Sequence, residues 1–269
     1  MRAPETSTES ARDVSNTRAG RMKDEGRGVD EKSLTSEGER FDQYAASYAD
    51  AINGEGAMRL TGESFEYYIE LRLSLVQELL TRAGSPAPSS IIDFGCGAGE
   101  TQVAIRRRYP KVRLLGVDAS AESIRVARAR ELPDAEFLIN EGHSIPTPDS
   151  SIDVGYSNGT FHHVDHGMHA GVARELYRVI KPGGHVFMFE NNGLNPIVAW
   201  VMSHNEVDRG AHRVPFWQLR RTFEDAGFRI RGVHFYAFFP KALEPLRRRE
   251  SHLRWLPLGA QYVVWGQKL

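Results

Sequence analysis

Residues 91–100 read IIDFGCGAGE, a short apolar run that ends in an acid and breaks into alternating glycines. An apolar run bounded by glycines is typical of a buried parallel strand. Glycines at 95, 97 and 99 let the backbone turn sharply and approach a ligand where a Cβ would collide. Residues 101–109 continue with a helical pattern, so the turn sits at a helix N-terminus whose N–H groups point outward. The stretch predicts a strand, a turn and a helix that hold a nucleoside-bearing cofactor.

The spacing of the glycines separates two classes of cofactor. A dinucleotide fingerprint needs G-x-G-x-x-G, with a pyrophosphate beside the third glycine. Glu100 stands at that third position, where its charge would repel a pyrophosphate. Asp93, just before the turn, suits a ligand with a cationic end. The pattern therefore disfavours a nicotinamide dehydrogenase.

At this turn the chain resembles the class I S-adenosylmethionine (SAM)-dependent methyltransferases, whose first motif reads D-x-G-x-G-x-G. Residues 93–99, DFGCGAG, fit the motif at every fixed position. The resemblance extends over residues 90–269 and implies SAM as the cofactor. It places Asp93, Gly95, Gly97 and Gly99 beside that cofactor.

A second acid follows the next predicted strand, residues 112–117. Asp118 stands about 20 residues beyond the glycines, where an acid in α/β nucleotide sites accepts hydrogen bonds from ribose hydroxyls. We predict this role for Asp118, with Ala119 also beside the cofactor. The alternative is that Asp118 only caps the predicted helix 121–130, a role that Ser120 could also fill.

The composition indicates which class of protein this chain belongs to and which partners it disfavours. The chain has 269 residues, 41% hydrophobic and 26% charged, with a formal net charge of -1, which suits one large globular domain plus extras. Near-neutral charge disfavours nucleic acid as the main partner. No apolar stretch reaches the roughly 18 to 20 residues that span a bilayer, and no signal-peptide core is evident, so we expect a cytoplasmic protein without membrane contacts. A single cysteine, Cys96, excludes an internal disulfide and a cysteine zinc cluster.

The chain divides near Gly38. Residues 1–38 are polar and contain no aromatic residue, so they cannot bury enough surface to offset ordering entropy, and we expect a disordered tail. The rest, 39–269, is expected to form a single methyltransferase domain. Its expected parts are cap helices in 39–82, a cofactor-binding core in 90–190, and an acceptor-side insertion with C-terminal strands in 191–269.

Strand and helix patterns alternate through this domain, which predicts a parallel, doubly wound sheet with its ligand at the carboxyl ends of the strands. The family resemblance implies a Rossmann-like α/β fold, whose seven-stranded, mostly parallel sheet ends in an antiparallel C-terminal hairpin and carries N-terminal cap helices. Later strands are predicted at 136–140, 151–156, 185–190, 229–238 and 260–266, and later helices at 168–180 and 215–226.

The resemblance also suggests later cofactor positions. The family often holds the adenine through a Gly-Asp-Ala loop after the third strand, and this chain reads Gly142-His143-Ser144 there. The missing acid leaves three alternatives for the adenine contact: the His143 ring, its backbone N–H, or the carboxylate of Glu141. Asn158, where the fourth strand ends, is carried over as a neighbour of the cofactor.

Histidines cluster in residues 161–166, FHHVDH. His162 and His166 could ligate one ion if the segment were helical, but many similar SAM enzymes carry a His-His pair here without metal, and we expect no metal site. Because imidazole titrates near neutral pH, His162 or His163 is a candidate general base. Structural packing and hydrogen bonding remain the first interpretation of both.

Two segments are expected to shape an acceptor pocket. Residues 41–48, with the pattern F-D-x-Y-x-x-x-Y, resemble the cap helices of small-molecule methyltransferases from bacterial biosynthetic pathways. Tyr44 and Tyr48 would face the cleft, Tyr48 near the cofactor, and Arg72 would pair with the cofactor carboxylate. An aromatic core face is the alternative for both tyrosines. Residues 191–212 would help to form the far wall.

These patterns predict a SAM-dependent methyltransferase that acts on oxygen or nitrogen of a small-molecule acceptor, expected to be a secondary metabolite. In-line attack on the sulfonium methyl makes positioning a large part of the rate. Two alternatives stay open: a SAM-binding protein of the same fold that promotes cyclisation or decarboxylation in a biosynthetic pathway, and a module that senses the cofactor. The acceptor and the oligomeric state do not follow from the sequence.

Overall fold

A computed structural model describes residues 38–43, 45, 56–140, 144–205 and 210–269. The predicted tail therefore lies outside the described residues, apart from Gly38. Seven strands form one sheet in the order β3-β2-β1-β4-β5-β7-β6. They are β1 (Ser90–Phe94), β2 (Arg113–Asp118), β3 (Ala135–Ile139), β4 (Ile152–Asn158), β5 (Ile180–Asn191), β6 (Arg229–Tyr236) and β7 (Gln261–Gln267).

Strand directions confirm the predicted fold class. β1 to β5 run parallel, and β7 pairs antiparallel with both β5 and β6. β5 begins at Ile180, earlier than predicted, because Ile180 already pairs with Ile152 before the register shifts at the Pro-Gly-Gly segment. The described helices are α3 (Gly56–Thr61), α4 (Phe65–Arg82), α5 (Glu100–Arg108), α6 (Ala121–Arg128), α7 (His166–Val179), α8 (Pro196–His204), α9 (Phe216–Asp225), the 3-10 helix η1 (Lys241–Arg249) and α10 (Glu250–Leu253).

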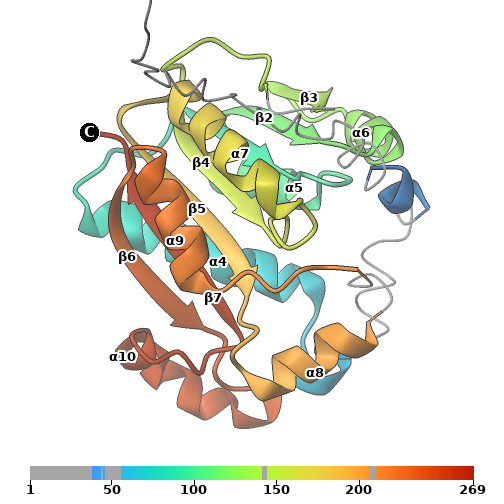
Figure 1. Cartoon of the computed structure of the whole chain (residues 1–269), viewed down its shortest axis with the longest axis vertical. Coiled ribbons are helices and arrows are strands. Elements are labelled where there is room, and N and C mark those ends of the chain that lie inside the picture. The colour runs from blue at the N-terminus through green and yellow to red at the C-terminus, as the bar shows by residue number, and fades with distance from the viewer. Residues whose placement is uncertain (1–37, 44, 46–55, 141–143, 206–209) are drawn as a thin grey trace, which may run out of the picture.

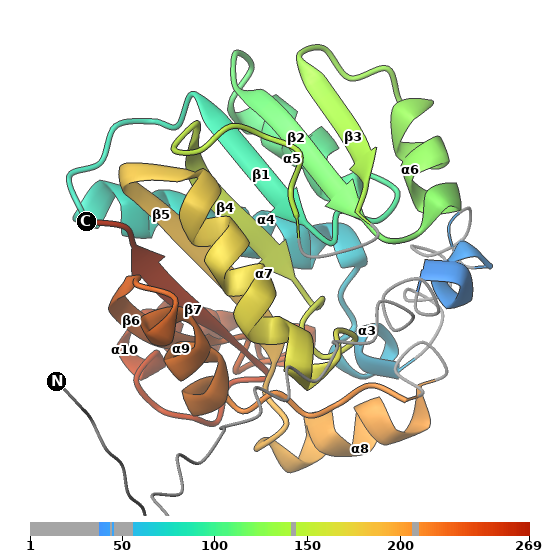
Figure 2. The same ribbon diagram turned by 45° about the horizontal axis from the view of Figure 1, so that its top comes forward.

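Helices cover both faces of the sheet, as Figures 1 and 2 show. α7 and α9 bury apolar side chains such as Val172 and Phe223 against one face. α4 and α5 cover the opposite face through residues such as Leu79 and Ile105. None of the helices in the described ranges has the length and apolar character that crossing a bilayer requires.

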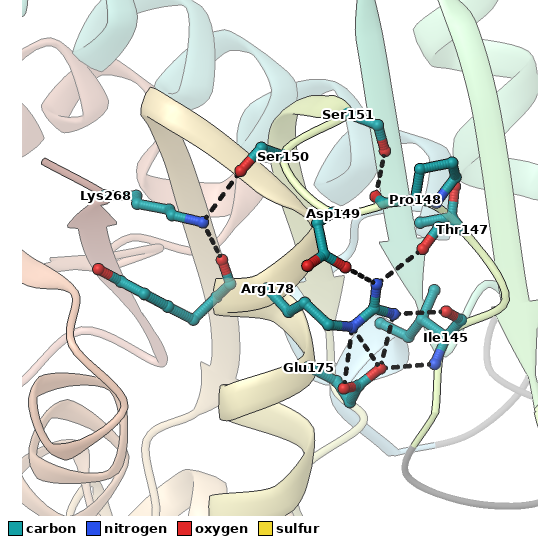
Figure 3. A network of polar contacts seen from close by, with 10 residues as sticks. Ile145, Thr147, Pro148, Asp149, Ser150, Ser151, Glu175, Arg178 and Lys268 are labelled. Atoms are coloured by element: carbon teal, nitrogen blue, oxygen red, sulfur yellow. Dashed lines mark hydrogen bonds and ion pairs between the residues drawn. The ribbon is translucent and has the colours of Figure 1, made fainter.

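The amino-terminal ends of the strands are held by polar contacts (Figure 3). Arg178, at the end of α7, donates to Glu175 at 2.8 Å and to Asp149 at 2.6 Å. It also donates to the carbonyl oxygens of Ile145 and Thr147. These bonds fix the segment before β4 against α7. The loops at this end are therefore tied down, and the cavities lie at the other end.

Two short helices stand at the carboxyl ends of the strands: α3, inside the segment predicted to form cap helices, and α8, which the sequence did not predict. α3 contacts α8, and both lie beyond the end of the sheet in Figure 2. α8 starts where it does because the Asn195 side chain accepts from the N–H groups of Ile197 and Val198, while Pro196 occupies the first turn. Both helices contribute residues to the wall of a cavity at this end of the molecule.

Candidate active site

A first cavity, of about 130 Å³, lies at the carboxyl ends of β1, β2 and β4. It brings together much of the predicted cofactor site. The predicted residues that line it are Asp93, Gly95, Gly97, Asp118, Ala119, Asn158 and His163. Residues that separate strands contribute thus meet at one edge, as the parallel topology requires.

Other predicted cofactor residues lie elsewhere. Gly99 caps the start of α5 with φ 84° and does not line the first cavity. Ser144 is exposed. Arg72 lines a second cavity, described below. Tyr44, Tyr48, Glu141, Gly142 and His143 lie outside the described residues.

The glycine turn shows why each glycine is needed. Gly95 and Gly97 have φ values of 80° and 53°, which side chains rarely tolerate. A Cβ on Gly95 would overlap the Thr160 side chain. A Cβ on Gly97 would meet no described protein atom within 4 Å, although Gly97 lines the cavity. The space in front of Gly97 is therefore open to a ligand.

Asp118 joins the second strand to the glycine turn. Its Oδ2 accepts from the Gly97 N–H at 2.8 Å, and its Oδ1 accepts from the Ser120 N–H at 2.9 Å. Ser120 caps α6, since its Oγ accepts from the Ser123 N–H at 3.0 Å. Burial raises the pKa of Asp118, while these two N–H groups act to lower it. Ser120, not Asp118, fills the capping role, and the Asp118 carboxyl lies in the cavity wall.

Asp93 is a buried acid at the end of β1, 3% exposed. Its Oδ2 accepts from Gln102 Nε2 at 2.7 Å, and its Oδ1 has no hydrogen-bond partner within the described chain. Burial raises the pKa of Asp93 to about 8; the Gln102 hydrogen bond opposes this and the Asp118 charge adds to it. A cationic ligand group beside Asp93 would favour the ionised form.

A second cavity, of about 340 Å³, adjoins the first and shares Phe65, Asn158 and Gly159 with it. Side chains from α3, α4, α8 and the segment after β6 line it, and most of these are apolar. The apolar members include Met58, Leu60, Ile197, Val198, Val201, Met202, Phe238 and Phe239. Residues 191–205 thus supply part of the wall. Trp200, however, is 56% exposed and packs on His204 rather than lining the cavity.

Arg72 is a buried cation in the wall of the second cavity, only 2% exposed. Its Nε and Nη1 have no hydrogen-bond acceptor in the part of the chain that the structure describes. The neighbouring phenols of Tyr156 and Tyr236 stay neutral because burial raises their pKa. A guanidinium keeps its charge even when buried, and an unpaired buried charge is costly. An anionic ligand group would offset that cost.

The two candidate histidines face different surroundings. His162, 3% exposed, lines the second cavity, and its Nδ1 lies 2.6 Å from Glu190 Oε2. His163 lines the first cavity, where its Nδ1 lies 3.1 Å from Arg40 Nη2. The pKa of His163 lies well below its usual range. Burial is the main cause, and the positive charges of His162 and Arg40 add to it. His162 lines the second cavity and contacts a carboxylate, whereas His163 lines the first cavity, and this geometry favours His162 as the candidate base.

The segment that carries these histidines is a turn, not a helix. Residues 161–163 are turn residues, and His166 is the first residue of α7. The His166 ring lies 5.0 Å from that of His169 and 5.1 Å from that of His212. The helical spacing that a shared ion between His162 and His166 would need is therefore not present.

The sequence predicted a strand at 185–190 but no role for Glu190, whose contact with His162 appears only in the structure. Glu190 is 2% exposed, and its Oε1 accepts from the Phe161 N–H at 2.7 Å. A signal was available, because Asp93, Asp118 and Glu190 each stand at or near the carboxyl end of a parallel strand. An acid at that place, at the end of an apolar run, indicates a functional position.

Comparisons with known proteins agree with this arrangement. Residues 91–184 match a methyltransferase domain family. The chain is 27% identical over 191 residues to trans-aconitate 2-methyltransferase of Azoarcus sp. (strain BH72), covering 71% of this chain and 67% of that protein. It is 35% identical over 126 residues to the trans-aconitate 2-methyltransferase of Rhodopseudomonas palustris (strain BisB5), covering 46% and 47%. This second match thus spans about half the length of that relative.

Solved structures share the fold at low identity. The [4+2]-cyclase SpnF superimposes with a TM-score of 0.61 at 17% identity, covering 88% of this chain and 96% of that one. A possible histamine N-methyltransferase from Thermotoga maritima gives a TM-score of 0.58 at 19% identity, covering 85% and 98%. At these identities the likeness establishes the architecture and leaves the acceptor open.

Proposed function

The chain carries a class I SAM-dependent methyltransferase domain, and from that premise we propose that it transfers a methyl group from SAM to oxygen or nitrogen of a small-molecule acceptor. The observation that carries the proposal is the pair of adjoining cavities. They share Phe65, Asn158 and Gly159, so a cofactor in the first and an acceptor in the second would meet at this common wall. Such a meeting point is what an in-line transfer needs.

The residues of the first cavity suit SAM, which supplies a methyl group on a positively charged sulfur. The open space in front of Gly97 leaves room for the adenosine. Asp118 is proposed to accept from the ribose hydroxyls, and Asp93 to face the ammonium group. Arg72 lines the second cavity, and its Nε and Nη1 have no acceptor among the described residues. It is proposed to pair with the cofactor carboxylate, which would reach it past the wall that the two cavities share. Residues 142–144 remain the predicted adenine loop.

The second cavity is proposed to hold an acceptor with a largely apolar surface, in keeping with a secondary metabolite. Its apolar lining comes from several elements, including Met58, Phe65 and Phe238. Asn191 and Gln261 also line it, and their amides are held in place because Gln261 Nε2 donates to Asn191 Oδ1 at 3.1 Å.

Calorimetry followed by intact-mass screening tests the proposal. SAM and S-adenosylhomocysteine should bind, whereas NAD should not. Candidate metabolites incubated with protein and SAM should then gain the mass of one methylene group. A rearranged acceptor without this gain, alongside tight SAM binding, would instead support the cyclisation or decarboxylation alternative. Absence of SAM binding would contradict both.

A pair of variants on one segment separates the roles of the two cavities. Val198 lines the second cavity, and Val198→Trp should block methyl transfer while SAM binds as in the wild type. Leu194 lies four residues earlier, is 47% exposed and does not line the cavity, so Leu194→Trp should leave transfer unchanged. Equal activity of both variants would show that the acceptor binds elsewhere.

A further inference from the structure

Glu190 and His162 form a buried ionisable pair beside the second cavity. The two residues are 2% and 3% exposed, and Glu190 Oε2 lies 2.6 Å from His162 Nδ1. The other carboxylate oxygen of Glu190 accepts from the Phe161 N–H at 2.7 Å. β5 and the turn after β4 each contribute one partner, so the pair bridges two neighbouring strands.

The pairing determines which ring nitrogen of His162 can take up a proton. The dyad proposed below requires an ionised Glu190, whose oxygens only accept hydrogen bonds, and it therefore requires the hydrogen on His162 Nδ1. In the neutral ring the remaining lone pair is then on Nε2. Glu190 also stabilises the charged ring that forms when Nε2 accepts a proton, because an opposite charge nearby favours the charged form. His162 is one of the residues that line the second cavity.

We propose that His162 and Glu190 act as a dyad that removes the proton from a hydroxyl group of the acceptor, with Glu190 as the positioning residue. This inference rests on the proposed methyl transfer. The acceptor O–H gives its proton to His162 Nε2, and an oxygen electron pair forms the new bond to the methyl carbon. The bond from that carbon to sulfur breaks and leaves its electron pair on sulfur, which yields S-adenosylhomocysteine. The proton on His162 then leaves to solvent.

The dyad also indicates the class of acceptor. A carboxylate is already ionised at neutral pH and needs no base to attack the methyl carbon. An amine in its neutral form already has a lone pair on nitrogen and attacks the methyl carbon without first losing a proton. A phenol or alcohol is neutral at pH 7 and gains most from proton removal. The structure therefore assigns an uncharged hydroxyl acceptor to this cavity.

The first test is spectroscopic and needs no turnover. The full chain with bound S-adenosylhomocysteine is titrated with 4-nitrophenol, whose absorbance distinguishes the phenol from the phenolate. Wild-type protein should hold the probe as phenolate at a pH where the free probe is neutral. His162→Ala and Glu190→Gln should lose this signal, and Glu190→Asp should recover part of it. His166→Ala and Glu175→Gln are matched controls outside the second cavity and should behave as wild type.

The second test is kinetic and uses an acceptor from the mass screen. Glu190→Gln should lower kcat by about 10²- to 10⁴-fold, the range for general base catalysis, with the acceptor KM and the SAM affinity unchanged. Glu190→Asp should again recover part of the loss. Melting temperature and SAM calorimetry show whether each variant is folded.

Several outcomes would overturn the dyad. Failure of wild-type protein to bind 4-nitrophenol, binding of the neutral phenol, or an equal phenolate signal in Glu190→Gln would each do so. So would the loss of SAM binding in the variants, which would indicate a purely structural pair. Unchanged kcat in Glu190→Gln would refute the dyad and leave methyl transfer standing. A wild-type protein that methylates nothing refutes the proposed function instead, and the phenolate signal then decides the dyad alone.

Discussion

The acids at the two ends of the central sheet have pKa values shifted in opposite directions. At the amino-terminal end, Asp153 accepts from Lys181 Nζ at 2.6 Å and from the Ser89 hydroxyl. Partial burial acts to raise the pKa of Asp153, but these hydrogen bonds prevail and lower it to about 2. At the carboxyl end, burial prevails and raises the pKa of Asp93 to about 8. Arg72 at that end has two nitrogens without an acceptor among the described residues.

This difference shows where the fold gains stability and where it is prepared for ligands. Charges at the amino-terminal end are already paired, as Arg178 is with Glu175 and Asp149, so substitutions there should act on folding. Polar groups at the carboxyl end are desolvated and only partly satisfied, which is unfavourable until a ligand supplies partners. Substitutions there should act on binding. Variants at the two ends can test this contrast directly.

The largest effect is expected from Gly97→Val. The new side chain would occupy the open space in the first cavity and should abolish SAM binding. Gly84 is the matched control, because its φ is 68° and a Cβ there would also meet no described atom within 4 Å. Gly84→Val carries similar backbone strain, about 1–2 kcal/mol, far from the cavity. Calorimetry should find normal SAM affinity in Gly84→Val, and comparable loss in both variants would remove the contrast.

Asp118→Ala should weaken SAM binding by about 1–3 kcal/mol, the scale for leaving buried polar partners unmade. Asp153→Ala is the counterpart at the amino-terminal end. It removes the acceptor of Lys181 and Ser89, so it should lower the melting temperature and leave SAM affinity intact. Calorimetry and thermal unfolding on both variants give the comparison. Equal SAM affinity in Asp118→Ala and wild type would refute the ribose assignment.

SAM affinity should rise with pH through the titration of Asp93. Between about pH 6 and 8 the carboxyl is mostly protonated before binding, and a cationic ligand group requires it ionised. The affinity should therefore increase, by at most about tenfold per pH unit. Calorimetry across this range should show that SAM affinity depends less on pH in Asp93→Asn than in wild type. An identical slope in both proteins would mean that the amino group of SAM alone titrates.

The raised pKa of Asp93 also affects the stability of the ligand-free protein. A folded-state pKa raised above the unfolded value means that the folded protein binds more protons between pH 3.8 and about 8. The contribution of Asp93 is thus fully present below this window and is lost as the pH rises through it. Denaturant titrations should show a smaller decline in Asp93→Asn over this window than in wild type.

The smallest effect, a change in the free energy of unfolding, is expected from replacing Arg178 or Arg72 by methionine. Arg178→Met removes its contacts with Glu175 and Asp149 and should lower the free energy of unfolding by roughly 1 kcal/mol. Arg72→Met replaces a buried cation by an apolar side chain of similar length, so ligand-free stability should stay equal or rise. Added SAM should stabilise Arg72→Met less than wild type. A melting temperature lowered more by Arg72→Met than by Arg178→Met would contradict the contrast.

Much of the architecture followed from local patterns in the sequence. The run at 91–100 indicated the strand, the turn and the helix, because glycine spacing and apolar runs are read over a few residues. The alternation that follows led to the doubly wound sheet, which the strand order confirms. Asp93 and Asp118 were found by their places after apolar strands. Methyltransferase chemistry and SAM came from the family resemblance that these residues carry.

Tertiary structure decided the contacts between residues far apart in the chain. His162 and Glu190 are separated by 28 residues in sequence and meet only because β4 and β5 are neighbours. Arg72 lies in the second cavity because α4 packs across the strands that carry Tyr156 and Tyr236. Local periodicity contains no information about such pairings, since they depend on which elements become neighbours and on how deeply each side chain is buried. The sequence by itself therefore determined the scaffold, the cofactor edge and the two candidate histidines, and the packing of the elements determined which of them meets a carboxylate and where the acceptor cavity lies.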